Sequence, residues 1–303
     1  MKIAITGASG FIGTALVPVL RRDGHTVVRL VRRQPAAPDE LPWNPTRRQL
    51  DPAHLADVDA VVHLAGVGVG DRRWTEKRKQ LILASRVDGT TTVSEALAEA
   101  EPRPRTLVSV SGVDYYADLG DTAVDESGPT GSSFLAAVCR AWEGATAAAE
   151  HAGIRVAILR TGLVCGPGGG LLRRLLVPAR LGLGGRLGSG RQWWSWISLA
   201  DHLGGVRHVL SHPHIAGPVN LTGPEPVTNA AFARVLGRVL RRPAVLPVPA
   251  FALRLALDGF ADEAILSGRR VLPRVLECSG YRFHHDTTEK ALRWATGREG
   301  RKR

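Results

Sequence analysis

The stretch TGASGFIG, close to the N-terminus, constrains the fold more than any other part of the chain. It joins a strand-like run at 2–6 to a helical pattern at 11–22. Gly7 permits a tight turn, Gly10 lets the backbone approach a phosphate, and Gly13 lets the helix pack closely on a sheet. The helix N-terminus adds free N–H groups and a positive dipole end. A structural turn without ligand is the alternative, but the strand–loop–helix context favours a dinucleotide-binding loop.

Strand-like and helical segments then alternate. The strand-like runs are continuous stretches of Val, Ile and Leu, which is typical of strands buried on both faces. They lie at 25–33, 59–66, 105–112 and 154–162, with helical patterns at 75–99 and around 132–145. The Pro-rich segment 35–52 is expected to be irregular. We therefore predict an α/β fold, a Rossmann-like doubly wound parallel sheet with a smaller, mostly helical C-terminal substrate region.

The composition of the sequence changes after about residue 165, where glycine becomes frequent. We expect a dinucleotide-binding domain at 1–165, completed by a returning strand near 217–222. Residues 166–303 would form a substrate-binding region interleaved with it, ending in a basic tail at 298–303.

Charge and composition narrow the possible partners. The chain has 303 residues and a formal net charge of +12, but its basic residues are spread along the sequence, so we expect no nucleic-acid partner. No apolar run approaches the roughly 18–20 residues that cross a bilayer, and the N-terminus does not resemble a signal peptide, so we expect no membrane partner. No motif indicates an oligomeric state.

Cysteine and histidine patterns give no sign of a metal site. The three cysteines are isolated, which is typical of a reduced, cytoplasmic protein without disulfides or structural zinc. His208, His212 and His214 have no accompanying carboxylate or cysteine, and Pro213 interrupts them. We therefore expect no bound metal.

The end of the second predicted strand discriminates between cofactors. Sites that prefer NAD place an acidic residue there to bind the ribose 2′-hydroxyl. Here the strand ends in Arg32 and Arg33, and no acid appears before Asp39. Two guanidinium groups suit a 2′-phosphate, so the predicted cofactor is NADP(H). A solvated pair of charges at a strand end is the alternative.

Six motifs in order now carry a family resemblance: TGASGFIG, HLAG, SVSGVDYY, LRTGLVCGPGGG, LGLGGRLGSGRQWWSWI and PVTNAAFARVLGRVLRRP. Together they resemble the extended short-chain dehydrogenase/reductase superfamily, in particular its atypical epimerase-family branch. Members of that branch are sometimes labelled nucleotide-sugar epimerases or cell-division-inhibitor homologues. The resemblance covers nearly the whole chain and implies a Rossmann-like domain, a smaller C-terminal substrate region and an NADP-type cofactor.

The resemblance also implies positions for the cofactor-binding residues. The pyrophosphate would meet Gly7, Ser9, Gly10, Phe11, Ile12 and Gly13. The 2′-phosphate would meet Arg32 and Arg33, and the adenosine side would be bordered by Leu64, Ala65 and Gly66. The nicotinamide would lie beside Gly162, Leu163 and Val164, with Ser109 counted among the cofactor-binding residues.

The chemistry expected of such a family is missing from its usual helix. Ordinary members carry Tyr-x-x-x-Lys there, the Tyr as general acid/base and the Lys lowering its pKa. In SSFLAAVCRAWEGA, anchoring on Glu143 puts Leu135 at the Tyr position and Cys139 at the Lys position. Neither can replace the residue it stands for.

A serine and two tyrosines suggest a displaced site. Ser111 lies at the end of the fourth strand, where the family has a polarising serine, and Tyr115 and Tyr116 follow closely. We hypothesise that Tyr116 or Tyr115 donates a proton and Ser111 polarises the substrate, with Arg86 or Arg160 shifting the pKa of the phenol. Tyrosines that merely pack or line the pocket are an equal alternative.

Two functions follow. The first is an NADP(H)-dependent oxidoreductase or epimerase-like enzyme for a small carbonyl or hydroxyl compound. The second is a non-catalytic NADP(H)-binding redox sensor, which the missing dyad favours. Trp193, Trp194 and Trp196 either cap the substrate pocket or form the core between the two parts of the chain.

Overall fold

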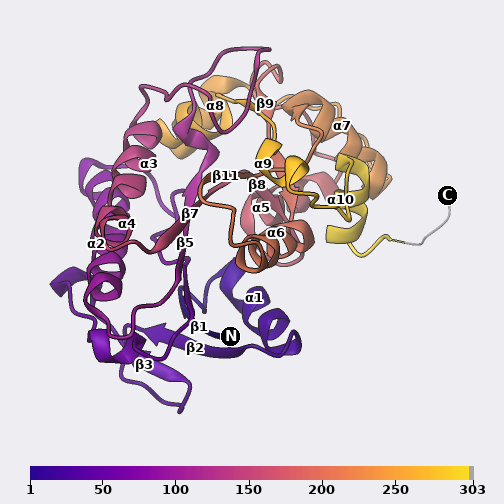
Figure 1. The fold of residues 1–303 in the computed structure, drawn as a ribbon. Coiled ribbons are helices and arrows are strands. Elements are labelled where there is room, and N and C mark those ends of the chain that lie inside the picture. Colours follow the sequence, from indigo (N-terminus) through magenta and orange to yellow (C-terminus); the bar gives the residue numbers. More distant parts are fainter. Residues whose placement is uncertain (300–303) are drawn as a thin grey trace.

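The computed structural model describes residues 1–299. At its centre is a seven-stranded parallel sheet in the order β11-β7-β5-β4-β1-β2-β3 (Figure 1). Its strands are β1 (Lys2–Thr6), β2 (Thr26–Val31), β3 (Glu40–Pro42), β4 (Ala60–His63), β5 (Thr106–Gly112), β7 (Arg155–Thr161) and β11 (Gly217–Leu221). The direction of winding reverses between β1 and β4, so their carboxyl ends border the crevice in which such folds bind nucleotides. The predicted α/β Rossmann-like fold is confirmed.

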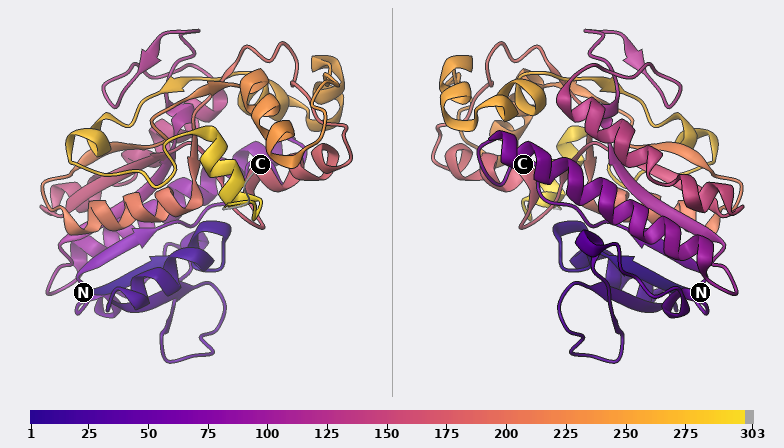
Figure 2. Two further views of the ribbon diagram at one scale, coloured as in Figure 1. Left: turned by 90° about the vertical axis from the view of Figure 1, so that its right-hand side faces the viewer. Right: turned by 90° about the vertical axis from the view of Figure 1, so that its left-hand side faces the viewer.

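Helices cover both faces of this sheet (Figures 1 and 2). Alternating side chains explain this, because Ile3 and Ile5 face one layer while Ala4 faces the other. The first layer holds α1 (Phe11–Arg22) and α6 (Leu199–Ser211); the second holds α2 (Glu76–Glu99), α3 (Phe134–Gly144) and α4 (Ala147–His151).

Side-chain caps mark where several of these helices begin. The side chain of Thr75 accepts a hydrogen bond from the backbone N–H of Arg78, and that of Ser133 accepts one from Ala136. Each cap satisfies one of the N–H groups that a helix start leaves unpaired. Helix α1 differs, because Gly10 precedes it without any side-chain cap.

The structure corrects the expectation that 35–52 is irregular. This segment contains β3, which pairs with β2 at the sheet edge, and the 3-10 turn Pro45–Arg47; a second 3-10 turn, Pro52–Leu55, begins where the segment ends. β3 has three residues and ends in proline, which has no N–H to donate and is therefore confined to edges. A strand this short has no recognisable period, so local pattern could not reveal it.

The C-terminal region is mostly helical, and its orange and yellow helices gather away from the N-terminal strands (Figure 2). Its helices are α5 (Gly170–Arg180), α7 (Asn229–Leu240), α8 (Ala250–Leu257), α9 (Arg274–Cys278), α10 (Thr288–Ala295) and the π-helical turn η4 (Ala261–Ile265). Three short strand pairs accompany them: β8 (Leu163–Cys165) with β10 (Trp196–Ser198), β9 (Trp193–Trp194) with β12 (Val227–Thr228), and β6 (Ala123–Val124) with β13 (Arg270–Val271). Within residues 1–299, no helix is both long and apolar enough to cross a membrane.

Candidate functional site

The glycine loop after β1 has the geometry that a bound pyrophosphate requires. Gly7 has a φ of 68°, in the left-handed region that favours glycine. A Cβ on Gly13 would lie 2.3 Å from the carbonyl oxygen of Gly7, so α1 can approach the loop only without a side chain there. Gly10 is exposed, and the uncapped first turn of α1 leaves N–H groups free to bind an anion.

The carboxyl ends of β1 and β4 are tied together beside this loop. The hydroxyl oxygen of Thr6 accepts hydrogen bonds from the backbone N–H groups of Leu64 (3.1 Å) and Ala65 (3.2 Å). It also lies 2.8 Å from Nδ1 of His63, a ring whose pKa burial lowers to about 4. Leu64 and Ala65 are thus held at the crevice, and Gly66 beside them is exposed.

Two arginines follow β2, and one of them, Arg33, is paired with a carboxylate. Two nitrogens of Arg33 donate to the carboxylate of the buried Glu40, at 2.8 and 2.6 Å. Arg29 donates to Asp39 in the same two-pronged way, and this holds the pKa of Asp39 down at about 2. Arg32 is exposed and forms no ion pair within residues 1–299. Both nearby acids are therefore neutralised, and Arg32 is available to an anion.

The remaining loop residues connect the crevice to α5. Ser9 is exposed, whereas Phe11 and Ile12 are half-buried. The Phe11 ring packs so closely on the glycine segment before α5 that a Cβ on Gly169 would lie 2.1 Å from it. The first turn of α1 therefore supports the wall of the adjoining cavity.

Of the three residues expected beside the nicotinamide, two line a cavity. A Cβ on Gly162 would lie 2.2 Å from the carbonyl oxygen of Ser195, and the N–H of Leu163 donates to that oxygen at 2.8 Å. Gly162 and Leu163 border the cavity, whereas Val164, the middle residue of β8, is buried in the core. Ser109 is also buried, inside the sheet, and does not reach the cavity.

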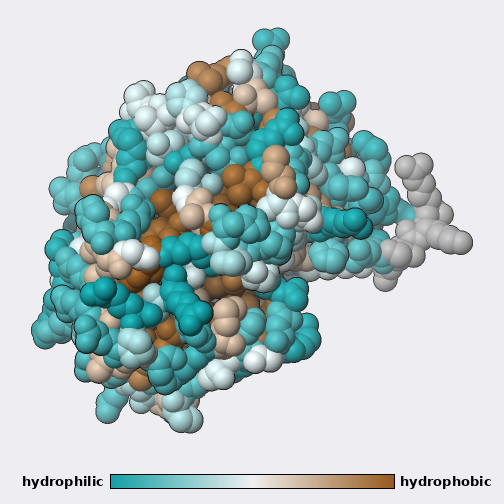
Figure 3. Space-filling model, in the orientation of Figure 1, coloured by the Kyte–Doolittle hydropathy of each residue, from teal (hydrophilic) through white to brown (hydrophobic). Residues whose placement is uncertain are grey.

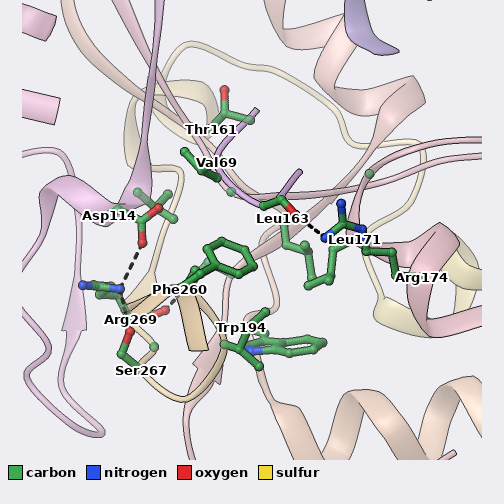
Figure 4. Close-up of a pocket in the computed structure, with 18 of the residues that line it drawn as sticks. Val69, Asp114, Thr161, Leu163, Leu171, Arg174, Trp194, Phe260, Ser267 and Arg269 are labelled. Carbon is green, nitrogen blue, oxygen red and sulfur yellow. Dashed lines mark hydrogen bonds and ion pairs between the residues drawn. The ribbon is translucent and has the colours of Figure 1, made fainter. Parts of the chain in front are cut away.

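This cavity, of about 730 Å³, lies between the carboxyl ends of β5 and β7 and the C-terminal region (Figure 4). Its apolar wall includes Phe260, Trp194 and Leu171, and the other tryptophan on its wall is Trp193. Trp196 instead is buried and donates its N–H to the carbonyl oxygen of Glu225 at 2.8 Å. The tryptophans thus divide between cavity wall and core.

One carboxylate and one guanidinium form an ion pair in the cavity wall. Asp114, in the 3-10 turn after β5, points toward Arg269, and Nη1 of Arg269 donates to Oδ1 at 3.1 Å (Figure 4). The Asp114 side chain is 32% exposed, while that of Arg269 is 7% exposed and is held by the carbonyl oxygen of Tyr116 and the hydroxyl of Ser267. Burial raises the pKa of Asp114, and the charge of Arg269 opposes that rise.

The structure does not support Tyr116 as the proton donor. Its side chain is fully buried, and its hydroxyl donates to Oδ1 of Asn220 at 2.7 Å while accepting from Nη1 of Arg160 at 2.9 Å. Arg160 does approach the phenol, but desolvation outweighs its effect and raises the pKa of Tyr116 to about 12. Arg86 lies elsewhere, over the ring of Trp142.

Ser111 and Tyr115 are likewise engaged outside the cavity. The hydroxyl of Ser111 donates to Glu143 at 2.8 Å, and Glu143 is paired with Arg160 at 2.8 Å. The ring of Tyr115 lies 3.5 Å beneath the Arg160 guanidinium. These residues and Tyr116 form one connected network, and none of them lines the cavity.

The helix that lacks the dyad has a structural role instead. Leu135 and Cys139 are buried, and burial raises the pKa of Cys139 to about 12. The carboxylate of Glu263, from the C-terminal region, accepts hydrogen bonds from the N–H groups of Phe134 (2.9 Å) and Leu135 (2.8 Å). The start of α3 thus anchors the segment that carries Arg269.

Comparison with known proteins places these features in a family. The description of the NAD dependent epimerase/dehydratase family matches residues 3–222. The chain belongs to that family. A second description, a domain of unknown function (DUF1731), matches residues 248–295, which include η4 and Arg269.

Individual members of the epimerase family resemble the chain over almost its full length. It is 48% identical to epimerase family protein Mb2239 of Mycobacterium bovis, over 98% of each chain. The structure of human epimerase family protein SDR39U1, solved with NADPH, superposes with a TM-score of 0.90 at 32% identity, covering 98% of this chain and 99% of that one. UDP-N-acetylglucosamine 4-epimerase from Bacillus cereus, at 19% identity and a TM-score of 0.77 over 99% and 100% of the chains, shares the fold. The chain is an epimerase family member of the atypical, SDR39U1-like branch.

Sequence reasoning missed the ion pair in the cavity. Asp114 stands inside the motif SVSGVDYY, at the carboxyl end of a parallel strand, where polar residues often serve function. That position is the feature of the sequence that could have identified Asp114 as a candidate site residue. No local pattern identifies Arg269, because it lies 155 positions from its partner in the sequence.

Proposed function

We propose that this epimerase family member is an NADP(H)-dependent oxidoreductase or epimerase-like enzyme acting on a small carbonyl or hydroxyl compound. One observation carries the proposal: a single cavity wall contains Gly162 and Leu163 together with the ionisable Asp114. A cofactor ring beside the first two and a substrate beside the third would share one enclosed space.

The cofactor fits the residues present. Two features suit a pyrophosphate: Gly13, which has no Cβ, packs against Gly7, and the first turn of α1 has no side-chain cap. Leu64, Ala65 and Gly66 would border the adenosine. The unpaired Arg32, with Arg33 beside it, suits a 2′-phosphate, and the NADPH named with the human relative supports this preference. When bound, the cofactor would supply or accept a hydride.

The proton donor that the geometry favours is Asp114 rather than a tyrosine. Its side chain reaches the cavity, whereas the hydroxyls of Tyr116 and Ser111 are committed to Asn220 and Glu143. Burial raises the pKa of Asp114, which favours the protonated form that a general acid requires. Arg269 acts as a positioning residue, because it holds the carboxylate at the cavity wall.

The alternative is a non-catalytic NADP(H)-binding redox sensor. Its support is the replacement of the dyad by the buried Leu135 and Cys139, together with the engagement of Ser111 by Glu143. Such a protein would bind the cofactor through the same loop and would turn over no substrate.

A fluorescence titration with NADPH and with NADH, followed by a screen of carbonyl compounds for NADPH oxidation, tests these proposals. Preference for NADPH with turnover supports the enzyme. Tight NADPH binding without turnover of any compound favours the sensor. If neither cofactor binds, both proposals fall together.

A further inference from the structure

Exposed apolar side chains concentrate on one part of the C-terminal region. Within residues 1–299, ten large hydrophobic side chains are exposed, and seven of them lie in 177–183 and 245–255. They are Val177, Leu181, Leu183, Val245, Leu246, Phe251 and Leu255, between 47% and 75% exposed. We call them the apolar patch. Isolated exposed hydrophobics are ordinary, but such a concentration marks a contact surface.

Backbone contacts join the two segments into one surface. The N–H of Leu246 donates to the carbonyl oxygen of Gly184 at 3.2 Å, and that of Val248 donates to Arg186 at 2.9 Å. Helix α8 follows directly, and none of its residues is buried. Phe251 and Leu255 stand four residues apart and therefore share one face of the helix. Figure 3 shows brown, apolar surface at the top of the molecule, where Figure 1 labels α8.

The stretches of chain that carry the patch are rich in arginine and contain few acids. Asp258 and Asp262 follow α8 in the sequence, and Asp262 pairs with Arg254. Residues 170–200 and 226–257 contain no Asp, Glu or Lys. They contain ten arginines, all exposed: Arg173, Arg174, Arg180, Arg186, Arg191, Arg234, Arg238, Arg241, Arg242 and Arg254. Three of them, Arg174, Arg238 and Arg254, pair with carboxylates from neighbouring segments. The other seven form no ion pair within the described part of the chain.

We propose that the apolar patch and its surrounding arginines bind the surface of an anionic lipid bilayer. A bilayer offers phosphate groups to the arginines and, just below them, hydrocarbon to Phe251 and Leu255. A second copy of this chain, paired through the same face, would bring arginines against arginines. A nucleic acid would satisfy the arginines but would leave the aliphatic side chains without an apolar partner.

This contact is peripheral and needs no spanning segment. The expectation of no membrane partner rests on the lack of an apolar run long enough to cross a bilayer, a criterion that a surface contact does not have to meet. Arg173, Arg174 and Val177 also line the cavity, so the docked face would adjoin the cavity rim.

Co-sedimentation of the full chain with vesicles tests the proposal. We expect binding to phosphatidylglycerol/phosphatidylcholine vesicles at physiological salt, weakening as salt is raised, and at least tenfold weaker partition to pure phosphatidylcholine. The double variant Phe251→Ser, Leu255→Ser and the double variant Arg241→Glu, Arg242→Glu should each weaken binding at least fivefold. Leu81→Ser, at an exposed position on α2 outside the patch, should leave it unchanged.

We expect the variants to remain folded, because the substituted side chains are exposed. Unchanged NADPH affinity and an unchanged thermal midpoint would confirm this. Absence of binding to anionic vesicles would overturn the proposal. So would binding that survives both double variants, or a dimer in analytical ultracentrifugation that the Phe251→Ser, Leu255→Ser variant abolishes. Salt-sensitive binding of DNA without vesicle binding would assign the surface to a nucleic acid instead.

Discussion

Asp114 and Arg269 form an ion pair of 3.1 Å across the wall of the cavity, although they lie 155 positions apart in the sequence. Asp114 belongs to the N-terminal half of the chain, directly after β5, whereas Arg269 belongs to the C-terminal region between η4 and β13. The pair therefore places the carboxylate of Asp114 where the two parts of the chain meet.

If Asp114 donates a proton, Asp114→Asn should lower kcat for carbonyl reduction roughly 100-fold or more, since general acids contribute about that much. In the parent enzyme the rate should fall as pH rises through the raised pKa of Asp114, because the protonated form is then lost, and the variant should lack that limb. Steady-state rates against pH measure both. Asp71→Asn, an exposed carboxylate at the cavity rim, is the control and should keep the profile. Equal rates in Asp114→Asn and the parent would exclude the role.

Arg32→Ala should weaken NADPH binding roughly 10- to 100-fold, the effect of losing a charge-assisted hydrogen bond of about 1.5–3 kcal/mol. NADH affinity should change little, because its ribose carries no phosphate. Paired fluorescence titrations measure the ratio. Arg22→Ala, another exposed arginine in the last turn of α1, should leave it unaltered. A parallel loss of NADH affinity would mean that Arg32 acts on the structure of the loop.

Tyr116→Phe should destabilise the fold by about 1–3 kcal/mol while leaving cofactor affinity intact. The substitution deprives Asn220 and Arg160 of a buried hydrogen-bond partner. Tyr115→Phe should cost little, because its hydroxyl has no hydrogen-bond partner within residues 1–299 and the ring keeps its contact with Arg160. Urea unfolding gives both free energies. Loss of activity at unchanged stability in Tyr116→Phe would restore the tyrosine as proton donor.

Gly13→Ala should destabilise the protein by about 2 kcal/mol or more, because its Cβ would meet backbone at 2.3 Å. Cofactor binding should weaken with it. Gly144→Ala, at the end of α3 where a Cβ meets nothing within 4 Å, should instead be neutral or stabilise by up to about 1 kcal/mol. Thermal midpoints of the two variants check the contrast, and similar midpoints would contradict the close packing of α1 on the loop.

Two buried histidines predict a loss of stability in mild acid. Burial lowers the pKa of His63 and of His202 to about 4, while the unfolded chain protonates near 6.5. The unfolded state therefore binds more protons between these values, and stability falls as pH decreases from about 6.5 to about 4, by on the order of 3 kcal/mol for each ring. Urea midpoints across that range measure the slope. His202→Gln should remove about half of it, and an unchanged slope would assign the effect to other groups.

Local sequence determined the fold class and the position of the glycine loop between β1 and α1. The spacing of Gly7, Gly10 and Gly13 between a strand and a helix is interpretable locally, because Gly10 and Gly13 approach the backbone of the loop itself; only Gly7 approaches a distant segment, which follows β4. The continuous apolar runs likewise predict buried parallel strands from short-range pattern alone. β3 was not predicted, because three residues ending in a proline show no alternation of apolar and polar side chains.

Tertiary structure decided which polar residues face the cavity. Tyr115 and Tyr116 are neighbours in sequence, yet only Tyr116 is fully buried. Its hydroxyl forms hydrogen bonds with Asn220 of β11 and Arg160 of β7. Asp114 reaches the cavity because Arg269 holds it there from a segment folded over the sheet end. Burial and ion pairing depend on such long-range neighbours, whereas strand and helix pattern depends on short-range ones. This is the physical reason that the strand–glycine loop–helix unit could be predicted from the sequence and the ion pair of Asp114 with Arg269 could not.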